Sequence, residues 1–150
     1  MALQLVARVW RTKNDAALAE LRLSATLAYP IMAIHRLGGG VRQSVLADAL
    51  GIEGPSLVRS LDTLGSMDLL ERRSDPSDRR AKALHLTPAG ERLAKRIETI
   101  VAQTRKELLA TIAPTDLAAA TRVLQSIAKV AGVSLLAPIA LADADGETGE

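Results

Sequence analysis

The sequence predicts a mainly α-helical protein that carries one small β-hairpin, and three observations support this fold class. Apolar residues make up 48% of the 150 positions and aromatic residues only 1%, so the core must be aliphatic. Leu and Ala are strong helix formers, whereas strands favour aromatic and β-branched residues. The apolar residues also recur at helical spacing over much of the chain. A length of 150 residues fits a single domain.

Two helices are expected at the beginning of the chain, over about Leu3–Leu23 and Ser24–Leu37. In the first, residues such as Leu5, Val9 and Leu18 follow helical spacing. The second contains Pro30, which must lie near the first turn or kink the helix, because proline has no amide hydrogen to donate. The run Gly38–Gly40 then breaks the helical pattern.

The next segment predicts a helix-turn-helix. Ser44 can cap a short helix over Val45–Leu50, and Gly51 can end it. Residues 52–54 form a turn, and Pro55 suits the first position of a second helix that runs to about Met67. Two short helices joined in this way are typical of a helix-turn-helix.

A hairpin and two further helices complete the predicted order of elements. Strands are expected over Leu69–Arg73 and Ala83–Leu86, joined by the turn-forming residues 74–78. Thr87 and Pro88 predict the start of a long helix to about Ile112. Pro114 opens a last helix to about Val130, and the acidic segment 143–150 is expected to be disordered. A hairpin that follows a helix-turn-helix makes it a winged helix-turn-helix.

Composition argues against several classes of protein. There is no cysteine, which excludes disulfides, thiolate metal sites and thiol chemistry, and no run approaches the length of a membrane span. Only two histidines occur, and no nucleophile elbow, phosphate-binding lysine motif or metal-ligand cluster is present. We therefore expect a cytoplasmic protein that is not an enzyme, with no cofactor, no metal and no membrane contact.

The charge is distributed unevenly around a net value of +2. Residues 1–41 carry +3, residues 42–82 carry zero, residues 83–142 carry +3 and residues 143–150 carry −4. Within the neutral block, five basic residues stand against Asp75 and Asp78. These basic residues form a local patch of +3 and are Arg72, Arg73, Arg79, Arg80 and Lys82. Charge alone does not establish a nucleic-acid binder.

The second helix of the helix-turn-helix carries two interleaved stripes. Leu57, Leu61 and Leu64, joined by Val58, should face the core. The other stripe can approach the floor of a major groove, and an arginine can donate two hydrogen bonds to a guanine edge. That stripe consists of Ser56, Arg59, Ser60 and Thr63. The alternative interpretation is an ordinary solvated helix face.

The hairpin tip is the second candidate for contact with DNA. Arg79 and Arg80 can reach away from the fold, and the negative potential of a minor groove attracts arginine. Asp78 lies two residues before Arg80 and is expected to orient its guanidinium by a bidentate bond. The alternative is a solvated turn with a weak surface ion pair.

Residues 51–88 resemble the DNA-binding core of the MarR family of transcriptional regulators. The segment DRRAKALHLT at 78–87 matches the wing pattern of that family, and GIEGPSLVRSLD at 51–62 is similar to its SlyA branch. The resemblance covers about residues 5–131. It implies an obligate homodimer on a pseudo-palindromic double-stranded DNA site, with recognition helices in the major groove and wings in the minor groove. One departure is Asp68, where the family usually has glycine.

The resemblance also assigns roles to residues and regions. It implies base contacts for Ser56 and Arg59, base or phosphate contacts for Ser60 and Thr63, and minor-groove entry for Arg80, held by Asp78. Arg79 and, more weakly, Arg72, Arg73 and Lys82 become phosphate candidates. The expected organisation is N-terminal helices over 1–37, the winged core over 38–87, C-terminal dimerisation helices over 88–142 and a tail over 143–150.

Many members of this family bind a small aromatic acid between the dimerisation helices and the winged core. A carboxylate would pair with Arg8 or Arg11, and a ring would lie against Trp10 or Met32. The full set of candidates is Arg8, Trp10, Arg11, Thr26, Tyr29, Met32 and His35. In the alternative interpretation, Trp10, Met32 and His35 are simple core or interface residues. A winged-helix module that binds protein and not DNA is the alternative function.

Overall fold

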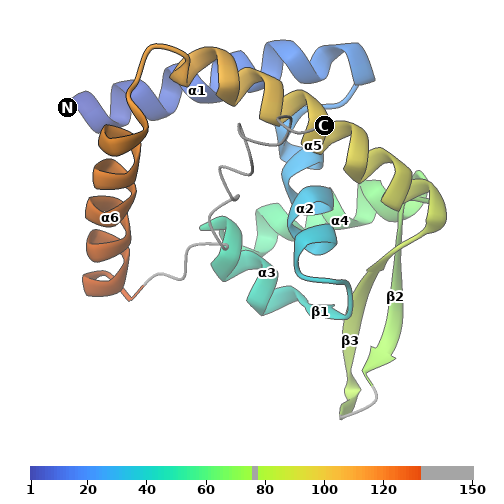
Figure 1. Ribbon diagram of the computed structural model, residues 1–150. Helices are drawn as coiled ribbons and strands as arrows, with labels where there is room; N and C mark the ends of the chain where they lie inside the picture. The colour runs from blue at the N-terminus through green and yellow to red at the C-terminus, as the bar shows by residue number, and fades with distance from the viewer. Residues whose placement is uncertain (76–77, 133–150) are drawn as a thin grey trace, which may run out of the picture.

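A computed structural model describes residues 1–75 and 78–132 and confirms a mainly α-helical fold with a small β wing (Figure 1). The helices are α1 (Ala2–Leu18), the short 3-10 helix η1 (Ala19–Leu21), α2 (Ala25–Arg36), α3 (Gln43–Leu50), α4 (Gly54–Ser66), α5 (Pro88–Leu109) and α6 (Pro114–Val130). The strands are β1 (Val41–Arg42), β2 (Leu70–Asp75) and β3 (Asp78–Leu86). In Figure 1, α5 runs beside α1 at the top of the molecule. Below these two helices, α2 leads down to α3 and α4, and α6 stands apart at the left.

The first expected helix ends earlier than its apolar pattern indicated. α1 ends at Leu18, a single 3-10 turn follows, and Arg22 has the left-handed backbone φ of 52°. Ser24 precedes α2 without a side-chain cap, and the Asp15 carboxylate accepts from the Ala25 amide at 3.3 Å. Pro30 is buried inside α2, as its sixth residue and therefore beyond the first turn.

An aliphatic core joins α1–α5 and the sheet, as the composition predicted. Its largest fully buried side chains are all non-aromatic, and Tyr29 packs against the core only in part. The largest fully buried side chains are Leu18, Pro30, Ile31, Ile34, Leu46, Leu57, Leu61, Leu64, Leu84 and Ile97. This core holds α4 against α2 and therefore orients the outer face of α4.

The wing is longer than predicted and belongs to a three-stranded antiparallel sheet in the order β1-β3-β2. Val41 pairs with Leu84, and Leu70 pairs with Leu86. Both hairpin strands extend into the segment expected to be a turn, because β2 ends at Asp75 and β3 begins at Asp78. The pairing of the two strands is irregular between Ser74 and Asp75. The strand β1 was missed because two residues carry no recognisable alternation.

Helix ends confirm several local signals and correct others. Gly51 ends α3 in the left-handed conformation, as predicted, but α3 begins at Gln43 after Arg42, so Ser44 is not its cap. Pro55 is the second residue of α4, and that helix ends at Ser66. α5 ends at Leu109, three residues before the predicted end, and α6 has its predicted bounds.

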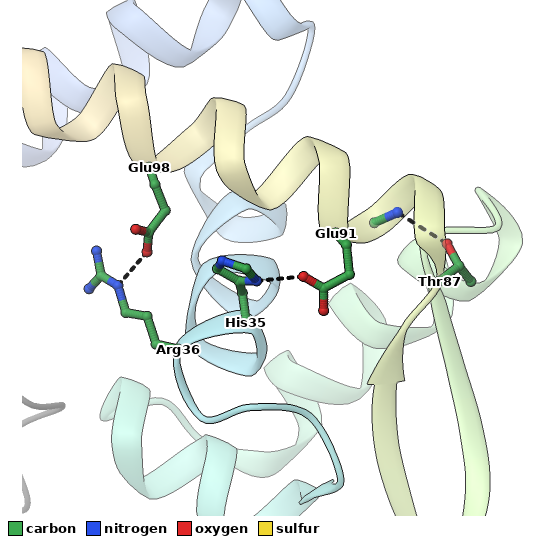
Figure 2. Close-up of polar contacts among 6 residues, drawn as sticks. His35, Arg36, Thr87, Glu91 and Glu98 are labelled. Atoms are coloured by element: carbon green, nitrogen blue, oxygen red, sulfur yellow. Dashed lines mark hydrogen bonds and ion pairs between the residues drawn. The ribbon is translucent and has the colours of Figure 1, made fainter.

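The end of α4, the start of β2 and the start of α5 meet at Thr87. The Thr87 hydroxyl donates to the carbonyl of Asp68 at 2.7 Å and accepts from the amide of Gly90 at 3.1 Å (Figure 2). The Thr87 amide donates to the carbonyl of Leu69 at 3.1 Å. Asp68 has a φ of 56°, so this residue adopts the left-handed conformation that glycine adopts more readily.

No single helix in the described ranges is long and apolar enough to cross a membrane. The segment Ala2–Leu21 taken together with α2 has the length and composition of a membrane span, but the two are bent by 87° relative to one another.

Gly90 is the tightest point of the Thr87 junction and gives a test of it. A Cβ on Gly90 would lie 2.1 Å from the Leu69 carbonyl oxygen, so backbone would have to move. We expect Gly90→Ala to lower the free energy of unfolding by about 1–3 kcal/mol, the usual cost of overpacking, in urea titrations. The control Gly65→Ala meets nothing closer than 3.9 Å and should raise it by about 0.5–1 kcal/mol, because Ala favours helix over Gly. Equal stabilities of the two variants would contradict this account.

Candidate nucleic-acid interface

The outer face of α4 presents three of the four DNA-contacting residues that were predicted on this helix. Ser56, Arg59 and Thr63 are exposed, opposite the buried Leu57 and its apolar stripe. The Thr63 hydroxyl donates to the carbonyl of Arg59 at 3.0 Å, which leaves its oxygen able to accept from a ligand. The face therefore combines one cation with two short hydroxyl side chains.

Ser60 corrects the predicted polar stripe. It is only 4% exposed, and its hydroxyl donates to the carbonyl of Ser56 at 3.3 Å. Ser60 therefore lies on the core side of α4 and is not available for base contact. Val58, which was expected to face the core, is 37% exposed instead. The sequence placed the apolar stripe too far towards Val58 and away from Ser60, because both residues border the stripe.

Two of the five residues of the predicted basic patch are paired with carboxylates. Arg72 on β2 donates to Asp62 on α4 at 2.7 Å, and Arg73 pairs with its neighbour Glu71. Lys82 lies close to the Ser74 hydroxyl, at 3.4 Å. Arg72 and Arg73 are thus held by acids of the same chain, which weakens them as phosphate candidates.

A further ion pair ties the wing to the rest of the sheet. Arg42 on β1 donates from its Nε to the Asp75 carboxylate at 2.8 Å, near the far end of β2. Neither residue was predicted to act at the site. They lie 33 positions apart, so only the folded sheet reveals the pair.

The wing tip can be described only in part. Asp78 is exposed at the first position of β3, opposite Asp75. Arg79 and Arg80 continue β3. Their side chains lie outside the described part of the structure, so their groove contacts and the predicted bond from Asp78 stay predictions.

Two ion pairs join the last turn of α2 to α5 (Figure 2). Nδ1 of His35 lies 2.5 Å from the Glu91 carboxylate, and Arg36 donates to Glu98 at 2.6 Å. The two acids are seven residues apart, so they lie on one face of α5. His35, a predicted effector contact, is therefore already paired with a carboxylate.

The other predicted effector residues are dispersed. Met32 is buried in the core, Tyr29 accepts from the Asn14 amide at 3.1 Å, and Thr26, Arg8 and Arg11 are exposed. Trp10 is half-buried. A cavity of about 320 Å³ between the α1–η1 segment and α5 is lined by Ala17, Glu20, Thr99, Ile100, Gln103, Thr104 and Glu107. None of the seven predicted residues lines it.

Comparison with known proteins places this geometry in a family. A model of the MarR family matches residues 31–81. The structure of transcriptional regulator PA3341 is 34% identical with a TM-score of 0.82, over 87% of this chain and 96% of that one. CouR from Rhodococcus jostii RHA1, solved with p-coumaroyl-CoA, is 27% identical with a TM-score of 0.79, over 85% and 89%. The S. aureus MepR–DNA complex is 18% identical with a TM-score of 0.77, over 87% and 94%, and shares the fold.

Proposed function

We propose that this chain, which belongs to the MarR family of transcriptional regulators, acts as a homodimer on a pseudo-palindromic DNA operator. The observation that carries the proposal is the outer face of α4, where Ser56, Arg59 and Thr63 are exposed beside a projecting wing. The residues of the segments 51–62 and 78–87 support a SlyA-like branch.

In this proposal α4 enters the major groove. Arg59 donates two hydrogen bonds to a guanine, and the hydroxyls of Ser56 and Thr63 contact neighbouring bases or phosphates. The first turn of α4, which contains Ser56, also offers unpaired amides and a positive dipole end to a phosphate. Arg80 enters the minor groove with Asp78 as its orienting partner, and Arg79 and Lys82 contact phosphates. The MepR–DNA complex supports this use of the fold.

Two substitutions separate base recognition from charge. Arg59→Ala should relax sequence preference at one base pair per half-site, at a cost of about 1–3 kcal/mol. Arg80→Ala should weaken binding to all sequences and flatten the dependence of log K on log salt by about one unit, because the minor groove loses a cation that neutralises about one phosphate charge. Both are measured by gel shift on DNA selected from the region upstream of the chain's own gene. The control Lys95→Ala removes an exposed cation of α5 and should leave both properties unchanged. If neither Arg59→Ala nor Arg80→Ala alters binding, the site assignment is wrong.

Unpaired apolar faces on the first and last helices support the homodimer. Leu5, Val6 and Val9 are exposed on α1, and Val123, Leu124 and Ile127 are exposed on α6. None of the residues of α6 is buried in the single chain. An amphipathic helix of this kind requires a partner surface.

Two glutamate substitutions on opposite faces of α6 test the dimer. Ile127→Glu places a charge on the apolar face and should shift sedimentation from dimer towards monomer at micromolar concentration, because an unpaired buried charge is costly. Gln125→Glu introduces the same charge on the opposite, exposed face and should leave the dimer intact. The proposed interface would be refuted by identical sedimentation of the two variants.

We infer that a small aromatic carboxylate is the effector. The relative CouR was solved with p-coumaroyl-CoA, an aromatic acyl thioester, which supports the aromatic part of this proposal but not the free carboxylate. Arg8 and Arg11 are exposed three residues apart on α1, and Trp10 between them is half-buried. Isothermal titration with salicylate should give heat for the wild type and a weaker affinity for Arg11→Ala. Lys13→Ala, an exposed cation on the same helix, should bind as the wild type does. An absence of heat above buffer controls would exclude this ligand.

A further inference from the structure

Asp62 lies on the ridge of α4 that points furthest from the core. Arg59, Asp62 and Ser66 follow one another at helical spacing, opposite the buried Leu57 and Leu61. The Asp62 side chain is 60% exposed. The carboxylate is therefore one helical turn beyond the arginine that, in the proposed function, contacts a guanine.

Neither helix formation nor stability explains an aspartate at this place. Aspartate is a poor former of helix interiors, and a carboxylate in the second half of a helix opposes the helix dipole. The ion pair with Arg72 is exposed on both sides, and such pairs contribute little to folding. The distinctive property of the Asp62–Arg72 pair is its geometry. Arg72 of β2 donates to the Asp62 carboxylate at 2.7 Å and so holds it on the outer ridge of α4.

A carboxylate in a major groove has a defined preference. It accepts a hydrogen bond from the exocyclic amine of cytosine, and it is repelled by phosphate oxygens. We propose that Asp62 is a specificity-determining residue that selects a cytosine near the guanine contacted by Arg59, and that Arg72 is its positioning residue. The inference rests on the proposed DNA-binding function.

The pair also limits attraction to unselected DNA. Arg72 neutralises Asp62 and is thereby withheld from phosphate. On a sequence without the cytosine amine, the carboxylate gains no hydrogen bond, and Arg72, which stays paired with it, adds no phosphate contact. The same two side chains thus favour the correct sequence and disfavour the others.

Binding-site selection on randomised duplexes tests the role of Asp62. Asp62→Ala should abolish preference at one base pair in each half-site, and Asp62→Asn should move that preference from cytosine to adenine, because asparagine pairs with the adenine edge. Release of Arg72 in Asp62→Ala should steepen the dependence of log K on log salt by about 0.9 on random DNA. Arg72→Gln should blur the preference at the same base pair.

A matched control and the overturning results separate this inference from the proposed function. Asp48→Asn removes an exposed carboxylate of α3 and should keep the wild-type selection profile. An unchanged profile in folded Asp62→Ala and Asp62→Asn, beside a wild type that selects a site through Arg59, would overturn the inference alone. A wild type that selects no sequence would overturn the proposed function and this inference together.

Discussion

The hydroxyl of Thr87 links the segment after α4 to the start of α5, and with the core it sets the geometry of the candidate interface. It donates to the carbonyl that ends the α4 segment and accepts from the amide of Gly90 in the first turn of α5. The same residue pairs its own amide with Leu69, just before β2. Thr87 thus bonds both to the Asp68–Leu69 link between α4 and β2 and to the first turn of α5, which helps to fix α4, the wing and α5 relative to one another. A helix end without such a partner would leave its polar groups to water.

Several arginines of the winged region pair with carboxylates of the same chain and so hold its elements together, which leaves less positive charge to attract phosphate. Arg42, Arg72 and Arg73 each contact an acid of the same chain, and two of these pairs join different elements. The electrostatic footprint is therefore smaller than the sequence charge indicates. If this surface binds DNA as proposed, its affinity depends on well-placed cations such as Arg59. The pairs from His35 and Arg36 in the same way hold the last turn of α2 against α5.

Local signals in the sequence predicted the fold well, and long-range contacts were outside their reach. Gly51 and Pro114 act through their own backbone, and Thr87 caps α5 by accepting from the Gly90 amide three residues later, so these helix boundaries could be predicted from neighbouring residues. Ser60 and Val58 exchanged faces because a period of 3.6 leaves residues at the border of a stripe ambiguous. Asp62 finds Arg72 ten positions away on another element, and no spacing rule predicts such a pair. The predicted effector residues differ in burial from exposed Arg8 to buried Met32, and their role stays a prediction.

The isolation of α6 has a consequence for how this regulator responds to its own abundance. A 17-residue helix with no buried residue is at best marginally stable in water. If the partner chain supplies the missing apolar contacts, ordering of α6 and association become one bimolecular equilibrium. The regulator then carries a threshold: below a certain number of molecules per cell, the chain loses a helix as well as a partner, and its occupancy of DNA falls more steeply than its concentration.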